Sequence, residues 1–366
     1  MNRFIVTQVE LWPVDIPLTD PFVVATGSRT VAENAFVRVT LKSGAQGYGE
    51  IAPFPEVGGE ERDTSLAVAS QLAKALLGQP ATHYRRIALQ FMEMAASHPA
   101  ARCGLETALL DALCRELNIP LWGFWGGADV RDRDTDITIP ITAVKQTLAL
   151  ARGWYDRGFR LFKLKVGADL DEDCRRLQAL HRAFPDIAFI VDVNQGFTRQ
   201  DCLRFVTEAK RIGAKIVLLE QPVIRDDLES LAALRRETNI PIAADESCRS
   251  LQDLRNILTA NAADVVNIKI TKTGVLGAMD IAASARAAGL RLMIGGMVET
   301  RIAMGCSFAL VLGTGGYNWL DLDTPLLMAV DPVKGGYLYT GPTLHPWLGA
   351  GLGLVTEASA PVVTIE

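Results

Sequence analysis

The stretch RLFKLKV, residues 160–166, decides the fold, because it places two lysines in a run that is otherwise typical of a buried strand. Charges are rare in buried parallel strands, and those at the C-terminal ends of barrel strands usually serve chemistry. Six later runs have the same form, a short apolar segment that ends in charged or polar residues: IAFIVDVN (187–194), KIVLLEQP (215–222), IPIAADES (240–247), DVVNIKI (264–270), LRLMIGGMVE (290–299) and YNWLDLD (317–323). Together these runs predict a cluster of reactive side chains at one end of a parallel sheet.

From residue 131 to residue 325, strand patterns alternate with amphipathic helical patterns. Successive strand ends are separated by roughly 25 to 28 residues, which is close to the size of one βα unit. Eight such units form either a closed barrel or an open doubly wound sheet, and the open sheet typically carries GxGxxG after its first strand. No such motif is present, so the sequence favours an α/β barrel whose strands end near Pro140, Lys165, Val193, Glu220, Asp245, Ile270, Gly296 and Leu322.

Residues 1–130 follow a different pattern, which is typical of an α+β module. Segments 4–13, 35–41 and 47–52 alternate like antiparallel strands, and the clearest helix that follows has Leu105, Leu109, Leu113 and Leu117 on one face. Segments 25–29 and 54–60 have neither pattern and are expected to be loops, which often close over sites. The glycine- and proline-rich segment 326–366 is expected to return to this module.

The composition is that of a globular protein with large cores, at 49% hydrophobic and 22% charged residues in a chain of 366. A net charge of −5 without a basic patch predicts no nucleic-acid partner. The six cysteines form no CxxC pair, and the N-terminus is too polar for a signal peptide, so we expect a cytoplasmic protein. No apolar run is long enough to suggest a membrane partner. Barrels of this kind often form symmetric homo-oligomers, although no interface is evident in the sequence.

Lys163 and Lys165 are two residues apart on one strand, so both ammonium groups are expected on the same face. Mutual repulsion and a nearby metal cation would lower the pKa of each, leaving a neutral fraction that can take a proton from carbon near pH 7. The alternative is an exposed strand edge with two solvated lysines. The apolar neighbours Phe162, Leu164 and Val166 disfavour that alternative, and we predict a catalytic role for the pair.

Asp192, Glu220 and Asp245 end three consecutive predicted strands, and carboxylates placed in this way converge at one mouth of a barrel. Oxygen ligands without His or Cys suit Mg²⁺ far better than zinc. Three independent helix caps or loop acids are the alternative, which the preceding apolar strands disfavour. Asn194 shares the face of Asp192 and is expected to support the metal ligands. The sequence therefore predicts Mg²⁺ as the cofactor.

Lys269 comes one strand after Asp245 and is expected opposite the lysine pair. Two bases on opposite sides of one carbon are what a racemisation or epimerisation needs, since one removes the proton and the other returns it to the opposite face. A metal that binds a substrate carboxylate would stabilise the negative charge that develops. Glu246 is either an acid that orients Lys269 or a plain neighbouring acid, and the sequence leaves both open. The four histidines lie away from the strand ends, so a His base is not expected.

The KxK strand, the Asp/Glu/Asp set and a lysine after the DES strand together resemble the muconate lactonizing enzyme subgroup of the enolase superfamily. The resemblance covers the whole chain. It implies a modified (β/α)7β barrel over residues 131–325, and an N-terminal α+β capping domain over residues 1–130 with a C-terminal return over 326–366. It also implies roles for the motif residues: acid/base catalysis by Lys165 and Lys269, substrate binding by Lys163, Thr138 and Met297, and Mg²⁺ binding by Asp192, Glu220 and Asp245.

The DLD motif at Asp321–Asp323 resembles that of the dipeptide epimerases in this subgroup. Period two places both carboxylates on one face, where they form a pair of acceptors for an ammonium group. In similar epimerases a DxD at the end of the eighth strand holds the α-amino group of the dipeptide. Muconate cycloisomerases and o-succinylbenzoate synthases bind no cationic amine. Two aspartates that merely cap a following turn are the alternative.

The resemblance implies an isomerase, a Mg²⁺-dependent dipeptide epimerase that inverts the α-carbon of the C-terminal residue through an enediolate. Similar Ala-Glu epimerases share the DPF at 20–22 but have an arginine where an ungapped comparison places Gly27, with Arg29 two residues on. The small apolar segment 22–27 therefore suggests dipeptides with neutral or hydrophobic side chains as the small-molecule substrate. The alternatives are an N-acylamino acid racemase or o-succinylbenzoate synthase, an L-Ala-D/L-Glu epimerase, and a non-catalytic binding protein on the same scaffold.

Overall fold

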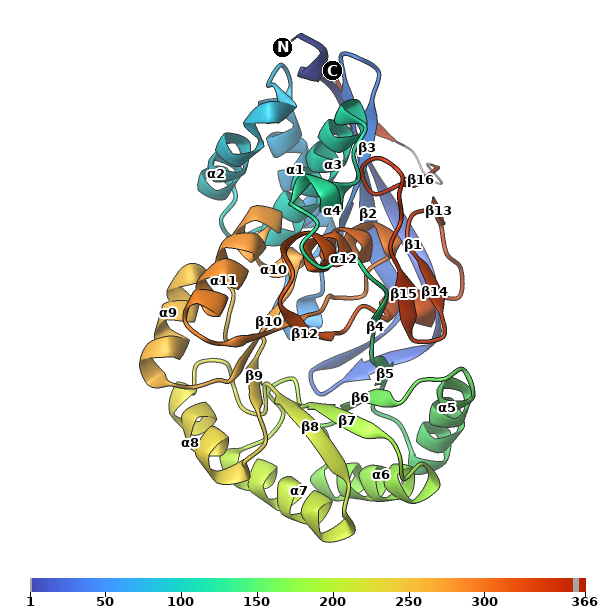
Figure 1. Cartoon of the computed structure of the whole chain (residues 1–366), viewed down its shortest axis with the longest axis vertical. Coiled ribbons are helices and arrows are strands. Elements are labelled where there is room, and N and C mark those ends of the chain that lie inside the picture. Colours follow the sequence, from blue (N-terminus) through green and yellow to red (C-terminus); the bar gives the residue numbers. More distant parts are fainter. Residues whose placement is uncertain (1, 358–361) are drawn as a thin grey trace.

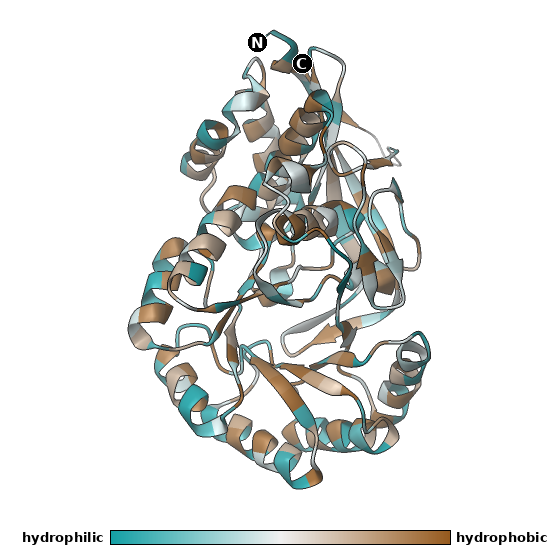
Figure 2. Ribbon diagram, viewed as in Figure 1, coloured by the Kyte–Doolittle hydropathy of each residue, from teal (hydrophilic) through white to brown (hydrophobic). Residues whose placement is uncertain are grey.

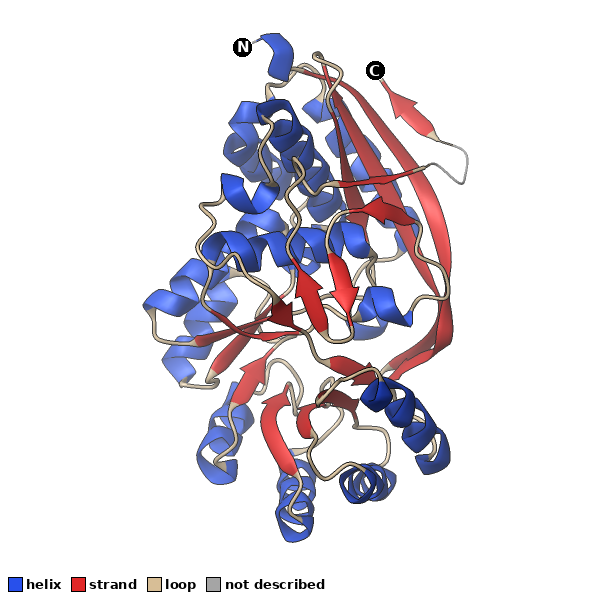
Figure 3. Ribbon diagram, turned by 45° about the vertical axis from the view of Figure 1, so that its right-hand side comes forward, coloured by secondary structure: helices blue, strands red, loops and turns tan. Residues whose placement is uncertain are grey.

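A computed structural model describes residues 2–357 and 362–366 of the chain. A cap built on an antiparallel sheet lies against one end of a barrel of parallel strands (Figure 1). Two long strands of the cap run down one side of the molecule to the barrel, and the first and last segments lie together at the far end of the cap. Helices surround the barrel strands and cover one face of the cap sheet (Figure 3).

The cap sheet is antiparallel throughout, with the strand order β17-β1-β2-β3. Buried and exposed residues alternate along part of β1, as in Val14 to Phe22, because one face of this segment packs into the core shared with the barrel. Its strands are β1 (Val6–Val24), β2 (Gly27–Leu41), β3 (Gln46–Ile51) and β17 (Val363–Ile365). The pairing of β17 with β1 brings the end of the chain back to the module formed by its beginning.

The two segments expected to be loops are more regular than the sequence suggested. Residues 27–29 belong to β2, which pairs with β1 as far as Val24↔Gly27, so only a tight turn at residues 25 and 26 remains. In the second segment, Pro55–Val57 form the 3₁₀ turn η2. Pro17 gave no sign that β1 extends past Pro13. In the described chain β17 pairs only with Val9–Leu11 and a single bridge joins Leu18 to Met328, and such a sparsely paired strand edge tolerates proline.

Three helices form the second layer of the cap: α1 (Arg62–Leu76), α2 (Tyr84–Met94) and α3 (Pro99–Leu117). Helix α3 is almost wholly buried between the cap sheet and the barrel, and of its four predicted leucines only Leu117, at 37% exposed, reaches the surface. It lies so close to β3 that a Cβ on Gly49 would fall 1.9 Å from the carbonyl oxygen of Gly104. Glycine is required at this crossing because no side chain fits.

Eight parallel strands in the order β12-β11-β10-β9-β8-β7-β6-β5 form the barrel. The strands are β5 (Ile137–Ile139), β6 (Leu161–Lys165), β7 (Ala188–Asp192), β8 (Lys215–Glu220), β9 (Ile242–Ala244), β10 (Val265–Ile268), β11 (Arg291–Ile294) and β12 (Tyr317–Leu320). The two edges meet just before β5, where Asp136 N donates to Leu320 O at 3.0 Å. The predicted α/β barrel with an α+β cap is confirmed.

Helices follow the barrel strands and cover their outer side: α5 (Val144–Asp156), α6 (Leu170–Ala183), α7 (Arg199–Ile212), α8 (Leu228–Thr238), α9 (Leu251–Ala260), α10 (Ile270–Thr273), α11 (Val275–Ala287) and α12 (Arg301–Thr314). Figure 2 shows strands that are largely hydrophobic and helices whose outer faces are hydrophilic, the amphipathic pattern that buries one stripe of each helix. Helix α12 is the exception, buried along nearly its whole length beside the cap.

Short elements complete the chain: η1 (Asn2–Phe4), η3 (Ala81–His83), α4 (Leu121–Phe124), β4 (Arg133–Asp134), η4 (Thr324–Leu327), β13 (Val333–Gly335), β14 (Leu338–Thr340), β15 (Thr343–His345) and β16 (Leu354–Thr356). All six cysteines are free thiols. Among the helices of residues 2–357 and 362–366, none is long and apolar enough to span a membrane.

Candidate active site

Strand β6 carries the two lysines of the KxK motif into the barrel interior. Both are buried, and the ammonium group of Lys163 lies 2.6 Å from Asp321 Oδ2 and 3.0 Å from Asp192 Oδ2. Lys165 Nζ donates to Asp192 Oδ2 at 2.6 Å. An exposed strand edge, the alternative for this motif, is wrong, because the period of two turns both lysines toward the buried carboxylates.

The three predicted metal ligands lie on adjacent strands at one end of the barrel. Parallel pairing sets Asp192 of β7 beside Glu220 of β8, and Asp245 follows the end of β9. All three are buried. Lys269 reaches Asp245 from the end of β10, with its Nζ 2.7 Å from Asp245 Oδ2. The sheet topology thus brings together side chains that are up to 158 residues apart in sequence, from Lys163 to Asp321.

Neighbouring carboxylates act on the pKa values of Lys163 and Lys269. Burial alone would lower the pKa of Lys163, but four neighbouring carboxylates raise it well above its ordinary value. The pKa of Lys269 is also raised against the effect of burial, chiefly by Asp245. For Lys163 the direction is therefore opposite to the expected lowering, because its ammonium group faces carboxylates.

The three predicted metal ligands differ in their pKa values. Against the effect of burial, Lys163 and Lys165 lower the pKa of Asp192 to about 2. Lys269 and Lys272 likewise hold the pKa of Asp245 well below its usual range. Burial and the charge of Asp192 raise the pKa of Glu220 to about 8. Of the three predicted metal ligands, Asp192 and Asp245 are thus ionised at neutral pH, and Glu220 titrates nearer to it.

The Asp192, Glu220 and Asp245 set fits a hard divalent cation, because its donors are carboxylate oxygens from three adjacent strand ends. Within the described residues Glu220 Oε2 makes no hydrogen bond, although it lies 3.0 Å from Lys163 Nζ. A second carboxylate group is more compact, with oxygens of Asp136, Asp321 and Asp323 all within 4.8 Å of one another. We favour the first set for two reasons. Ammonium groups lie between its carboxylates, so positive charge already occupies this position. Two members of the second set, Asp321 and Asp323, form the DLD motif, whose expected role is to accept hydrogen bonds from a substrate ammonium group.

The residues after β7 and β9 link the lysines to the carboxylates. Asn194 accepts from Lys165 Nζ at 3.0 Å, and its backbone N donates to Asp192 Oδ1 at 3.0 Å. Its side-chain Nδ2 donates to Glu246 Oε1 at 3.2 Å. Glu246 therefore supports Asn194 and makes no hydrogen bond to Lys269 within the described chain, which disfavours an orienting role for Glu246 on that lysine.

The DLD motif follows β12 and faces the KxK strand. Asp321 pairs with Lys163, and Asp323 Oδ2 accepts from the backbone N of Thr138 at 2.6 Å. Thr138 is directly paired with Lys163 across β5 and β6. The other oxygen of Asp323, Oδ1, is buried and makes no hydrogen bond within the described residues. An acceptor pair with a free oxygen therefore lies beside the lysines.

Three further buried residues belong to this cluster and were not predicted. Asn267 Nδ2 donates to Glu220 Oε1 at 2.8 Å, and Lys272 Nζ lies 2.6 Å from Asp245 Oδ1. Asp136 lies beside Asp321 and Asp323 and makes no side-chain hydrogen bond within the described chain. Asn267 and Asp136 are two residues before Lys269 and Thr138, so the period of two was a usable signal for both.

The lysines surround a small pocket that the cap closes. Its enclosed space is about 20 Å³, and Phe22, Val24, Phe54, Val57 and Met297 form its apolar wall. A small-molecule substrate is larger than this space, so its entry requires residues of the pocket wall to move.

Hydrogen bonds from two arginine side chains stabilise the closed wall. Arg29 Nε donates to Glu56 Oε1 at 2.6 Å, and Arg249 Nη2 donates to the carbonyl oxygen of Val57 at 2.7 Å. Arg29 therefore binds a cap residue instead of facing the pocket. At Gly27 a Cβ would lie 2.4 Å from Glu56 Cγ, so this turn has no room for a larger residue while Glu56 is in place.

Two family models match most of the chain. The model described as the mandelate racemase / muconate lactonizing enzyme N-terminal domain matches residues 6–126, and the model described as enolase C-terminal domain-like matches residues 146–360. The chain belongs to the enolase superfamily. Like superfamily relatives that are named epimerases and racemases, it is an isomerase.

Relatives within the superfamily match most of its length. An L-Ala-D/L-amino acid epimerase of Populus trichocarpa is 40% identical over 92% of this chain and 81% of its own. An aromatic dipeptide epimerase of Herpetosiphon aurantiacus is 41% identical over 93% and 96%. The crystal structure of a dipeptide epimerase from Cytophaga hutchinsonii, complexed with Mg and the dipeptide D-Ala-L-Val, has a TM-score of 0.94 at 30% identity and covers 99% of this chain and 100% of that one.

Proposed function

We propose that this enzyme is a dipeptide epimerase that inverts the α-carbon of the C-terminal residue, with Lys165 and Lys269 as its two bases. The observation that carries the proposal is their placement. They line one pocket from β6 and from the end of β10, which are four strands apart in the eight-stranded barrel and so on opposite sides of it. The superfamily relatives that act on dipeptides support the same conclusion.

The two lysines are proposed to work in turn. Lys165 in its neutral form takes the proton from the α-carbon of the L isomer. The C–H bond breaks, an N–H bond forms, and the electron pair passes into the substrate carboxylate as an enediolate. Lys269 then donates its proton to the opposite face, which leaves the D isomer. Lys163 is proposed to stabilise the carboxylate oxygens by its charge.

Asp192, Glu220 and Asp245 are proposed to hold Mg²⁺, which when bound supplies positive charge that stabilises an enediolate. Their oxygen donors and the free Oε2 of Glu220 support this assignment.

The boundaries between a cap of residues 1–130 and 326–366 and a barrel of residues 131–325 are likewise a proposal, supported by the pairing of β17 with β1.

Asp321 and Asp323 are proposed to bind the substrate ammonium group, because Asp323 Oδ1 is a buried acceptor without a hydrogen bond in the described residues.

The preferred side chains of the dipeptide substrate are proposed to be neutral or hydrophobic. The pocket wall is apolar, Arg29 is already paired with Glu56, and the Gly27 turn has no room for an arginine. Thr138 and Met297 line the same pocket and are proposed to contact the substrate.

Deuterium exchange tests the two-base proposal. L,L-dipeptides are incubated with the enzyme and Mg²⁺ in D₂O, and mass spectrometry with chiral analysis follows label and inversion separately. Wild type is expected both to incorporate deuterium and to invert the α-carbon. Lys269→Ala is expected to exchange the L isomer without inverting it, and Lys165→Ala to exchange only the D isomer. The exposed Lys145→Ala is the control and is expected to match wild type. Exchange confined to N-acylamino acids, or none, would contradict the proposal.

Asp323→Asn separates dipeptides from N-acylated substrates. A neutral amide loses charge-assisted hydrogen bonding to an ammonium group, so KM for a dipeptide is expected to rise about tenfold or more, with a smaller effect on kcat. Steady-state kinetics with a dipeptide and its N-acetyl derivative measure this. An unchanged KM for the free-amine dipeptide would show that the DLD motif does not bind the amine.

A further inference from the structure

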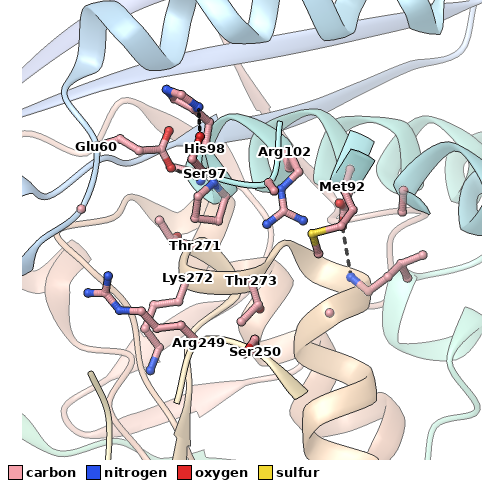
Figure 4. A pocket seen from close by; sticks show the side chains of 18 of the residues that line it. Glu60, Met92, Ser97, His98, Arg102, Arg249, Ser250, Thr271, Lys272 and Thr273 are labelled. Carbon is pink, nitrogen blue, oxygen red and sulfur yellow. Dashed lines mark hydrogen bonds between the residues drawn. The ribbon is translucent and has the colours of Figure 1, made fainter. Parts of the chain in front are cut away.

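A second and much larger cavity lies between the cap and the barrel. Its volume is about 1080 Å³, slightly above the upper end of the usual range for small-molecule sites, about 300–1,000 Å³. Helices α2 and α3 form one wall, and the segment from the end of β10 through α11 forms another (Figure 4). It shares only Phe54 and Met297 with the lysine pocket. These two side chains therefore separate the two spaces, and no role proposed above requires the larger one.

Arg102 on α3 is the unusual residue of this cavity. It is 3% exposed, and within the described chain its Nε makes no hydrogen bond and its guanidinium joins no ion pair. Figure 4 shows the guanidinium group below α3, on the side of the cavity. A buried cation without a partner is costly, and native proteins seldom keep one without a reason.

The other charges of the cavity wall already have partners. Arg249 donates to the carbonyl oxygens of Val57 and Gly58, and Lys272 pairs with Asp245. Of the two carboxylates whose charge acts on Arg102, Glu60 accepts from the backbone N of Ala100 at 2.6 Å.

The second carboxylate, Glu106, is one helical turn from Arg102 but is engaged elsewhere. It accepts from the backbone N of Leu276 at 3.1 Å, at the start of α11. Glu106 therefore ties the cap to the barrel, and Arg102 is left facing the cavity. Burial lowers the pKa of Arg102, which is the direction expected for a cation that lacks a close counter-ion.

We propose that this cavity is a binding site for a small organic anion with an apolar body, whose carboxylate pairs with Arg102. Charge complementarity selects the anionic end of the ligand, because a guanidinium group binds a carboxylate through paired hydrogen bonds. The remaining wall selects the apolar end, since Ala88, Leu276 and Met92 contribute hydrocarbon surface. Leu89, at 68% exposed, adds an apolar side chain at the rim.

The ligand would lie behind the wall of the lysine pocket. Thr271, Lys272 and Thr273 line the cavity and belong to α10, which begins directly after Lys269. Met297 and Phe54 face both spaces. The site is independent of the proposed epimerase reaction, and its binding can be measured without any turnover.

Isothermal titration calorimetry of the full chain with octanoate tests the site. Wild type is expected to bind octanoate, and Arg102→Met to bind it about tenfold more weakly or worse. Arg85→Met is the matched control, because Arg85 lines the same cavity but lies 3.8 Å from Asp280, and it is expected to stay within about twofold of wild type. Octanamide, which has no charge, is expected to bind wild type no better than octanoate binds Arg102→Met.

Two results of the titration would overturn the proposal. One is the absence of octanoate binding to wild type. The other is equal octanoate affinity in wild type and Arg102→Met, which would place the ligand elsewhere, including the lysine pocket.

A thermal melt without ligand gives a second test that does not depend on the choice of probe. Methionine at position 102 removes an unpaired buried charge and keeps most of the side-chain volume, so Tm is expected to be unchanged or higher. A fall in Tm of more than about 4 °C would show that Arg102 is a structural cation with a partner inside the fold, and would overturn the proposal.

Discussion

Asp136 is a single residue whose ionisation is made costly by the site around it. It is fully buried in the barrel beside Asp321 and Asp323, and neither of its oxygens accepts a hydrogen bond within the described chain. Burial raises the pKa of Asp136 well above its ordinary value, and the two neighbouring aspartates raise it further. A carboxyl group in this position destabilises the fold whenever it is ionised.

Asp136→Asn is therefore expected to stabilise the protein by about 1–3 kcal/mol at pH 7. Because the folded pKa is raised, the wild-type carboxyl favours folding most below its unfolded pKa, near 4, and this advantage is lost as the pH rises. The gain should shrink at pH 4. Melting curves at the two pH values measure it, with the exposed Asp134→Asn as control. A loss of stability at pH 7 would mean that Asp136 has a partner that needs its charge.

At this scale the sequence was sufficient for residues at strand ends and insufficient for their neighbours. Lys165, Asp192 and Glu220 follow apolar runs directly, and parallel pairing places them side by side, as expected. Lys272 lies on the α10 turn, outside any strand pattern. Its contact with Asp245 depends on the path of that turn, which sequence periodicity does not encode.

Among the elements, α6 has a role beyond covering the barrel. Its Arg176 is fully buried, and its guanidinium group donates to the carbonyl oxygens of Lys165 at 2.7 Å and of Pro140 at 2.6 Å. It also pairs with Asp173 at 3.1 Å. One helix side chain thus holds the ends of β5 and β6, and with them the backbone that carries Lys165.

Arg176→Met and Arg175→Met form a matched pair on this helix. Arg176→Met leaves buried carbonyl groups and Asp173 without a donor, so a loss of about 3–5 kcal/mol in the free energy of unfolding is expected. Arg175 forms an exposed ion pair with Glu172, and its substitution should change stability by less than about 1 kcal/mol. Urea unfolding measures both. Similar losses in the two variants would contradict the role assigned to Arg176.

Elements were predicted well where burial on both faces made a strand a continuous apolar run. The barrel strands are such a case, because the inner faces of amphipathic helices cover their outer side. Strand β1 was predicted only in part. Beyond Pro13 it pairs with β2, and within the described chain its other edge is bridged only at Leu18, by Met328, so this edge accommodates Pro17 and Pro21 and the proline signal for a loop was misleading.

For the whole molecule, Glu50 is a central link between the cap and the barrel side. From β3 its carboxylate accepts from Thr300 N at 2.9 Å and from Ala303 N at 3.1 Å, at the start of α12. Burial, and to a smaller extent Glu299, raises the pKa of Glu50 to about 7. The docking of the two parts is therefore coupled to the protonation of one buried carboxyl.

Wild type is expected to lose on the order of 3 kcal/mol of stability through this group as the pH rises from about 4.5 to 7, because the folded state holds the proton more tightly than the unfolded chain. Glu50→Gln cannot titrate, so its stability should vary less over this range even if it is lower throughout. Denaturant unfolding at several pH values measures the slope, with the exposed Glu33→Gln as control. Equal slopes in wild type and Glu50→Gln would contradict the assignment.

The hairpin of β1 and β2 joins two regions with different constraints. Its register shifts between Pro17 and Phe22, and beyond that point three pairs, Phe22↔Arg29, Val23↔Ser28 and Val24↔Gly27, form the tip that covers the lysine pocket. The core of the cap lies on the other side of the shift. Mutations in the tip can therefore alter the pocket without disturbing the packing of the cap, which gives evolution a short segment in which substrate preference can diverge while catalysis and stability are retained.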